Sequence, residues 1–181
     1  EIAEADIQAV VDVLRGDWVT TGPAVPEFEA AMSERMGARH AVAFSSGTAA
    51  LHGSIFAAEL GEGDEAITTP MTFCATANSI IFQGATPVFA DVSEDTLNID
   101  PAEVERRITP QTKALIPVDY AGHPADLETL VEIARRHGLT IIEDACHAPG
   151  AALDGRAVGS ISDMTVFSFH PVKHLTTGEG G

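Results

Sequence analysis

Positive charge is scarce in this sequence of 181 residues, which has 10 Lys plus Arg against 27 Asp plus Glu and a formal net charge of −17. So acidic a chain repels the phosphate backbone of nucleic acids, and we expect no nucleic-acid partner. Lysine occurs only at Lys113 and Lys173. An anionic ligand must therefore be held mainly by backbone N–H groups and a few local cations.

Cysteine is also rare, with Cys74 and Cys146 as the two instances. Two cysteines without a CxxC pair exclude a disulfide scaffold and the common zinc motifs, so reduced thiols are expected. The first ten residues are acidic and helical in pattern, unlike a secretory signal peptide. These features together predict a cytoplasmic protein.

A long apolar run suited to a membrane is missing as well. Residues 66–90 carry no formal charge, but Pro70, Gly84 and Pro87 interrupt them. A spanning helix needs about 20 predominantly apolar residues, so this stretch predicts a buried strand, helix and strand, and no membrane contact is expected.

The chain does contain a regular alternation of apolar runs and helical patterns. Strands are predicted at 40–44, 65–68, 86–90, 114–118, 139–142 and 164–169. Helices are predicted around 7–14, 23–36, 48–60, 73–83, 102–108 and 126–137. Strands that alternate with helices indicate an α/β fold with a mostly parallel sheet and helices on both faces. We expect one domain over residues 1–181.

In such sheets, ligands bind at the carboxyl ends of the strands. Ser46, Gly47 and Thr48 lie where a strand is expected to turn into a helix. The free N–H groups of a helix start can bind phosphate, although an ordinary helix cap fits the same residues. The pattern is neither GxGxxG nor GxxxxGK[ST], which disfavours nicotinamide and nucleoside-triphosphate sites.

Asp144 ends a buried apolar strand, where a carboxylate must be paired or hydrogen-bonded. It can serve as a metal ligand, a general base or the partner of a protonated ring nitrogen, or it can simply accept backbone hydrogen bonds. His147 follows three residues later. No further ligand at suitable spacing accompanies them, so no metal is expected.

Lys113 precedes an expected strand and fits a solvated strand end. Lys173 lies between His170 and His174, just past another strand. A desolvated lysine near histidines can attack a carbonyl as the neutral amine. A phosphate cradle, Asp144 for a pyridine nitrogen and Lys173 for a Schiff base are together what pyridoxal phosphate requires. Phe73 can stack on the pyridine ring, or it can be a core aromatic.

Four ordered segments carry a family resemblance: 45–51 (SSGTAAL), 72–78 (TFCATAN), 143–148 (EDACHA) and 168–173 (SFHPVK). They resemble the sugar aminotransferases of the DegT/DnrJ/StrS type, which are fold-type-I pyridoxal-phosphate enzymes. The resemblance implies that residues 1–181 form the cofactor-binding large domain. It also implies a small C-terminal domain outside this chain, a homodimer when full length, and weak or absent activity for residues 1–181 alone.

The resemblance also assigns roles to individual residues. Lys173 holds the cofactor covalently and moves protons, and Asp144 keeps the pyridine nitrogen protonated. His147 and Phe73 pack against the ring, while the phosphate group is held by Gly47, Thr48 and Ser168. The candidates on the substrate side are Thr20, Thr21 and His174, although residues 18–23 fit an ordinary turn between helices equally well.

Residues 169–174 (FHPVKH) and 176–181 (TTGEGG) are most similar to C4 aminotransferases of UDP-4-keto-6-deoxy-hexoses, as in the pseudaminic acid pathway. These enzymes take the amino group from L-glutamate. Asp119 stands where many members have histidine, which leaves open whether this strand contacts the substrate. The alternatives are amination at C3 or of another nucleotide ketosugar, a non-catalytic relative that binds the cofactor or a sugar nucleotide, and a nicotinamide oxidoreductase.

Overall fold

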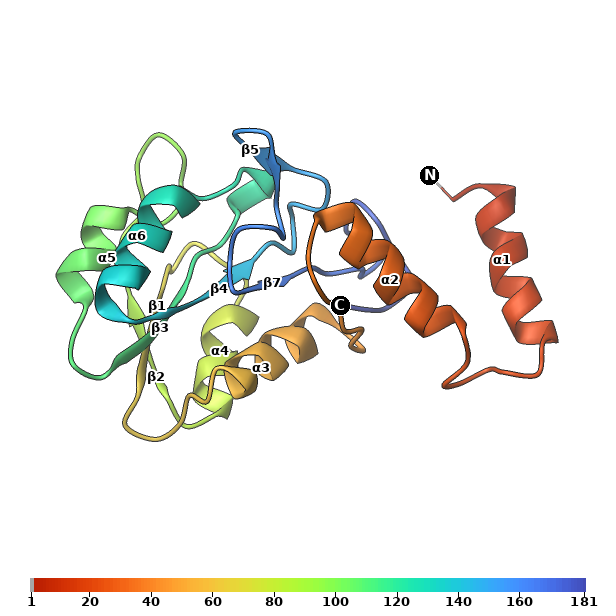
Figure 1. The fold of residues 1–181 in the computed structure, drawn as a ribbon, viewed down its shortest axis with the longest axis horizontal. Helices are drawn as coiled ribbons and strands as arrows, with labels where there is room; N and C mark the ends of the chain where they lie inside the picture. The colour runs from red at the N-terminus through yellow and green to blue at the C-terminus, as the bar shows by residue number, and fades with distance from the viewer. Residues whose placement is uncertain (1) are drawn as a thin grey trace. The chain divides into compact units, whose positions relative to one another are not determined.

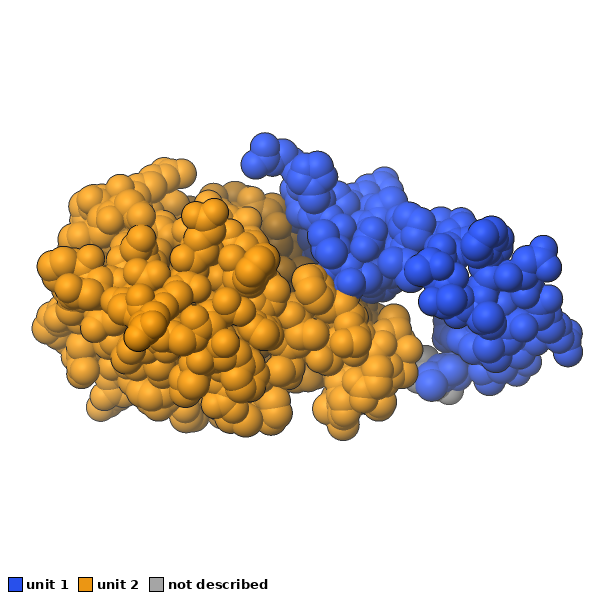
Figure 2. Space-filling model, turned by 90° about the horizontal axis from the view of Figure 1, so that it is seen from below, with its two compact units in different colours: residues 1–43 blue, residues 44–181 orange. Residues whose placement is uncertain are grey.

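The computed structural model describes residues 2–181, which form two compact units that divide between Ala43 and Phe44 (Figure 2). The smaller unit contains two helices, α1 (Glu4–Arg15) and α2 (Ala24–Met36). Both confirm the helical spacing in the sequence. Helix α1 buries none of its residues, and α2 ends at Gly37, which adopts the left-handed conformation (φ 68°) that glycine tolerates.

The larger unit is built on a five-stranded sheet in the order β2-β1-β3-β4-β7 (Figure 1). The strands are β1 (Glu65–Thr68), β2 (Thr86–Phe89), β3 (Thr112–Ile116), β4 (Thr140–Asp144) and β7 (Met164–Val166). Every neighbouring pair is parallel. Because all strands run the same way, their carboxyl ends meet at one edge.

Two helices cover each face of this sheet (Figure 1). Helices α3 (Gly47–Ala57) and α4 (Ala75–Phe82) pack on the face of Ala114, Ile142 and Val166. Helices α5 (Pro101–Arg107) and α6 (Leu127–His137) pack on the face of Ile67, Leu115 and Ile141. Burial of both faces explains why successive residues of the central strands are apolar, such as Ile141 and Ile142 in β4, and it confirms the predicted α/β architecture.

Helix α6 shows how the local sequence defines an element. The Asp126 side chain accepts a hydrogen bond from the Thr129 N–H (3.1 Å), and basic residues fill the last turn, where they complement the helix dipole. Gly138 ends the helix with φ 67°. The apolar stripe that includes Leu127 and Leu130 is fully buried.

The prediction of a strand over residues 40–44 was wrong. These residues form no regular strand. An extended segment needs a backbone partner, and within the larger unit Phe44 has one at Gly181: the Phe44 N–H donates to Gly181 O (2.8 Å) and the Gly181 N–H donates to Phe44 O (3.1 Å). The predicted strand 164–169 is also shorter, because the chain leaves the sheet after Val166.

Three short elements were not predicted: the turn of 3₁₀ helix η1 (Tyr120–Gly122) and the antiparallel pair β5 (Ala152–Leu153) and β6 (Arg156–Ala157). The uncharged stretch 66–90 folds as strand, helix and strand, as predicted. None of the helices in the described part of the chain has the length and apolar character needed to span a membrane.

Candidate active site

The carboxyl edge of the sheet gathers polar residues from distant parts of the chain. Asp144 is the last residue of β4, Ser168 follows β7, and Thr72 follows β1. The first turn of α3 lies at the same edge, because a Cβ added to Gly47 would be 3.0 Å from the Ser168 Cβ and 3.2 Å from the Cys146 Sγ. The structure thus brings together the predicted residues Gly47, Asp144 and Ser168.

Asp144 is held as a hydrogen-bond acceptor and is only 5% exposed. The Thr76 hydroxyl donates to Oδ2 (2.7 Å) and the Cys146 N–H donates to Oδ1 (3.3 Å). The Thr72 hydroxyl lies 2.7 Å from that of Thr76 and extends the network. A carboxylate has about four acceptor positions, so Asp144 retains capacity for a further donor such as a protonated ring nitrogen.

The start of α3 offers free backbone donors. The Ser46 hydroxyl caps the helix by accepting the Ala49 N–H (3.1 Å), and the N–H groups of Gly47 and Thr48 have no acceptor among residues 2–181. The first turn contains no acidic residue. This end of the helix is therefore electropositive within an acidic chain and suits an anion.

Lys173 lies in a loop that is closed at its base by backbone hydrogen bonds. The Phe169 N–H donates to Gly180 O (2.9 Å) and the Thr177 N–H donates to Phe169 O (3.1 Å). Lys173 is half-buried, and its own N–H donates to His170 O (2.9 Å). Its positive charge lowers the pKa of Cys146 and of His147, although burial raises the pKa of Cys146 overall; Lys173 therefore lies near the segment that follows β4.

The pKa of His147 lies below its ordinary value. Partial burial is the largest cause, and the positive charge of Lys173 adds to it, while Asp144 opposes the shift. His174 also lowers this pKa, which places the charge of His174 near the same group. His147 is therefore a neutral imidazole at neutral pH, able both to stack and to hydrogen-bond.

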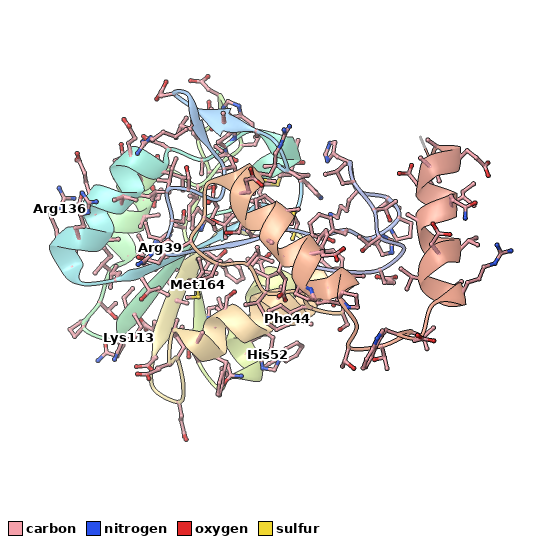
Figure 3. All side chains as sticks on the ribbon, turned by 45° about the vertical axis from the view of Figure 1, so that its right-hand side comes forward. Arg39, Phe44, His52, Lys113, Arg136 and Met164 are labelled. Carbon is pink, nitrogen blue, oxygen red and sulfur yellow. The ribbon has the colours of Figure 1, made fainter. Side chains whose placement is uncertain are left out.

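Other predicted residues lie at the rim or outside this edge. Phe73 is 69% exposed, so it is not a core aromatic. Thr20 and Thr21 belong to the smaller unit, between α1 and α2, and their substrate role stays a prediction. Lys113 lies at the opposite, amino end of the strands, where its Nζ is 4.0 Å from Asp64 (Figure 3). Residues 2–181 hold no group of three or more His, Cys, Asp or Glu side chains suited to a metal.

The sequence did not reveal which residues support Asp144 and α3. Thr72 lies in a bend before α4 and Thr76 in its first turn, so no periodicity within one element indicated that they act together. Gly181 packs directly under α3: a Cβ there would lie 2.3 Å from the Ser46 carbonyl carbon and 2.4 Å from the Gly47 nitrogen. Nothing in the local sequence predicts that approach.

The comparison with known proteins agrees with this arrangement. The model of the DegT/DnrJ/EryC1/StrS aminotransferase family matches residues 1–181. The spore coat polysaccharide biosynthesis protein SpsC of Bacillus subtilis is 48% identical over 180 residues, which cover 99% of this chain and 46% of SpsC. The chain thus spans about half the length of the curated relatives that it matches.

Solved structures are similar over the whole chain. The PLP-form of the putative sugar aminotransferase Spr1654 from Streptococcus pneumoniae has a TM-score of 0.97 at 39% identity, covering 100% of this chain and 50% of Spr1654. Helicobacter pylori PseC, an aminotransferase involved in the biosynthesis of pseudoaminic acid, has a TM-score of 0.94 at 37% identity, covering 99% of this chain and 49% of PseC. These likenesses confirm the predicted fold-type-I architecture.

Proposed function

This chain belongs to the DegT/DnrJ/EryC1/StrS aminotransferase family, and from that premise we propose that the protein is a pyridoxal-phosphate-dependent aminotransferase. In this proposal it moves an amino group from L-glutamate to a nucleotide-linked ketosugar. The observation that carries the proposal is one sheet edge with a buried aspartate, an open helix start and a lysine loop. Asp144, Gly47 and Lys173 mark these three parts.

The residues at this edge fit the cofactor. The absence of a side chain at Gly47 leaves the start of α3 open, and a methyl group there would press on Ser168 and Cys146. An acidic side chain would repel a phosphate group, and the first turn of α3 has none. Asp144 keeps acceptor capacity in a buried position, as a partner for a pyridinium nitrogen must.

Pyridoxal phosphate, when bound, supplies an aldehyde that captures amines and a ring that withdraws electrons from the reacting carbon. The N–H groups of Gly47 and Thr48 and the hydroxyl of Ser168 hold its phosphate group. Asp144 keeps a proton on the ring nitrogen because its carboxylate stabilises the positive charge. Phe73 and the neutral His147 orient the ring and exclude water from its faces.

Lys173 has two roles in the proposed reaction. Its Nζ anchors the cofactor between turnovers, and once free it acts as the base and acid. It would take the proton from the α-carbon of the amino donor and pass it to the cofactor, and in the second half-reaction it would move a proton from the cofactor to the sugar carbon.

The finer assignment is amination at C4 of a UDP-4-keto-6-deoxy-hexose, which the similarity to PseC supports. Thr20, Thr21 and His174 are the proposed contacts on the substrate side, and a homodimer is the proposed assembly. Amination at C3 or of another nucleotide ketosugar is the alternative within the same chemistry.

The test is transfer of ¹⁵N from labelled L-glutamate to UDP-4-keto-6-deoxy-hexose by the full-length protein, followed by mass spectrometry of the sugar nucleotide. We expect a ¹⁵N-amino sugar from the wild type and from Lys113→Ala, and none from Lys173→Ala. Labelled product from Lys173→Ala would contradict the role of the lysine. Absence of product from the wild type with this sugar, but not with a 3-keto analogue, would move the assignment to C3.

A further inference from the structure

Two carboxyl groups lie buried directly behind the candidate site. Asp119 follows β3 and Glu143 precedes Asp144 in β4, and both side chains are 0% exposed. Successive side chains of a strand point to opposite faces, so Glu143 lies on the face of the sheet away from Asp144. Asp119 is fully buried in this structure, so its side chain is not accessible to a substrate there.

The hydrogen bonds around the two groups leave one oxygen of each without a donor. The Ala125 N–H donates to Asp119 Oδ1 (3.0 Å). The hydroxyls of Ser162 (3.0 Å) and Thr165 (2.8 Å) donate to Glu143 Oε2. The remaining oxygens, Asp119 Oδ2 and Glu143 Oε1, are buried and receive nothing, although the two side chains are within hydrogen-bonding reach of each other.

Two ionised carboxylates cannot satisfy each other because both are acceptors, and burial makes their repulsion large. Within residues 2–181, neither group has an ion-pair partner among Lys, Arg and His. The charge of Asp144 also acts on Asp119, and it is negative as well. A single proton between the two free oxygens removes the repulsion between the carboxylates. It also supplies the missing hydrogen bond, since it turns one acceptor into a donor.

We propose that Asp119 and Glu143 share one proton between Oδ2 and Oε1, and that this buried pair positions Asp144 in the cofactor site. The positioning of Asp144 in the cofactor site rests on the proposed function. The proton resides on Asp119, since Glu143 already accepts two hydroxyl hydrogen bonds and Asp119 accepts one N–H. Burial, with the charge of Glu143 as the next cause, raises the pKa of Asp119 to about 8, which agrees with this assignment.

The positioning follows from the backbone that the pair joins. The Asp119 N–H donates to Asp144 O (3.0 Å) and the Asp144 N–H donates to Pro117 O (2.9 Å). The carboxyl pair adds a side-chain link between the same two segments, one residue from Asp144 along the chain. The two backbone hydrogen bonds and the carboxyl pair together restrict the backbone conformation at the end of β4. They thereby restrict the direction of the Asp144 carboxylate.

Single substitutions in the full-length protein separate the parts of this proposal. Asp119→Asn keeps an acceptor for the Ala125 N–H and brings an N–H donor to Glu143, but removes the shared proton. Asp119→Leu has nearly the same size and leaves Glu143 Oε1 without a donor. Asp95→Asn removes an exposed carboxylate and is the matched control.

The first measurement is the infrared band of a protonated carboxyl in the cofactor-free protein at neutral pH. We expect the band in the wild type and in Asp95→Asn, and its loss in Asp119→Asn and in Glu143→Gln. Absence of the band from the wild type, or its persistence in Asp119→Asn, would overturn the shared proton.

The second measurement is the dissociation constant of pyridoxal phosphate. We expect Asp119→Asn to bind close to the wild type and Asp119→Leu to bind about tenfold more weakly; equal binding by Asp119→Leu would overturn the positioning role. If Asp119→Leu does not fold, the double variant Asp119→Asn/Glu143→Gln, in which two N–H₂ groups meet, takes its place with the same expectation. A wild type that binds no cofactor would overturn the proposed function and the positioning role, while the infrared band decides the proton independently.

Discussion

Thr76 is the residue whose hydroxyl meets the buried Asp144 carboxylate, with 2.7 Å between Thr76 Oγ1 and Asp144 Oδ2. We predict that Thr76→Val lowers the free energy of unfolding of the cofactor-free protein by about 1.5–3 kcal/mol, the range for hydrogen bonds to charged groups. Thr76→Ser keeps the hydroxyl and is the control. Urea unfolding of the full-length protein measures both; a Val variant as stable as the Ser variant would show that the hydrogen bond does not matter.

A pH dependence follows from Asp119. Its pKa is about 8 in the folded protein against an ordinary value of 3.8, so between these values the folded state binds a proton that the unfolded state does not. The free energy of unfolding therefore falls as pH rises through this window, by at most about 1.4 kcal/mol per pH unit, and levels off above it. This is opposite to the usual behaviour of a carboxylate.

The measurement is urea unfolding of the wild type and of Asp119→Asn at several values between about pH 6 and pH 9. The difference between the two removes the contributions of groups that do not interact with Asp119. We expect the wild type to lose stability relative to Asp119→Asn up to about pH 8. Parallel pH profiles of the two proteins would contradict the raised pKa.

Among the elements, α3 depends on a close approach by Gly181. A Cβ at that position would lie 2.3–2.4 Å from the backbone of Ser46 and Gly47, so Gly181→Ala must displace the helix start. We predict a loss of about 1–3 kcal/mol in unfolding free energy and weaker binding of pyridoxal phosphate. Gly61→Ala is the control, because a Cβ there has no atom within 4 Å. Equal cofactor affinity in both variants would mean that α3 does not hold the phosphate.

The cap of α6 gives a prediction of local stability. Asp126→Ala removes the acceptor for the Thr129 N–H and should lower the free energy of unfolding by about 0.5–2 kcal/mol. Asp126→Asn keeps a capping oxygen and should restore most of that loss. Since α6 covers the sheet face away from Asp144, cofactor affinity should stay unchanged in both; a large loss of affinity would contradict this separation.

The elements that the sequence predicted are those whose causes are local. Helix α6 has an apolar stripe, an acidic cap, a basic end and a final glycine, and β1 is a short apolar run between turn formers. The wrongly predicted strand at 40–44 is equally apolar, but a strand needs a partner, and in the larger unit only Phe44 has one, at Gly181. No local sequence pattern predicts that Phe44 pairs with Gly181, which is far away in the sequence.

The same distinction applies to the site. Asp144 and Gly47 were predictable because a strand end and a helix start are recognisable in the sequence, while Ser168 followed from the family resemblance. The hydroxyl of Thr76, 68 positions from Asp144 in sequence, and the burial of Asp119 against Glu143 were not, because both depend on which face of the sheet each side chain occupies after folding.

At the scale of the molecule, the formal charge of −17 raises the question of how the chain binds an anionic cofactor. A phosphate group approaching this chain is repelled on average. The structure provides an electropositive helix start at α3 and a half-buried Lys173 in the loop after β7, while Lys113 lies at the other end of the sheet. The proposed function therefore requires a cofactor bound covalently at Lys173.

The most direct test is to incubate the full-length protein with pyridoxal phosphate, reduce it with borohydride, and locate the added mass by peptide mass spectrometry. We predict a phosphopyridoxyl group on Lys173 that persists in Lys113→Ala and is lost in Lys173→Ala. A label found on Lys113 alone, or no label on Lys173 in a protein that is folded and saturated with the cofactor, would contradict it.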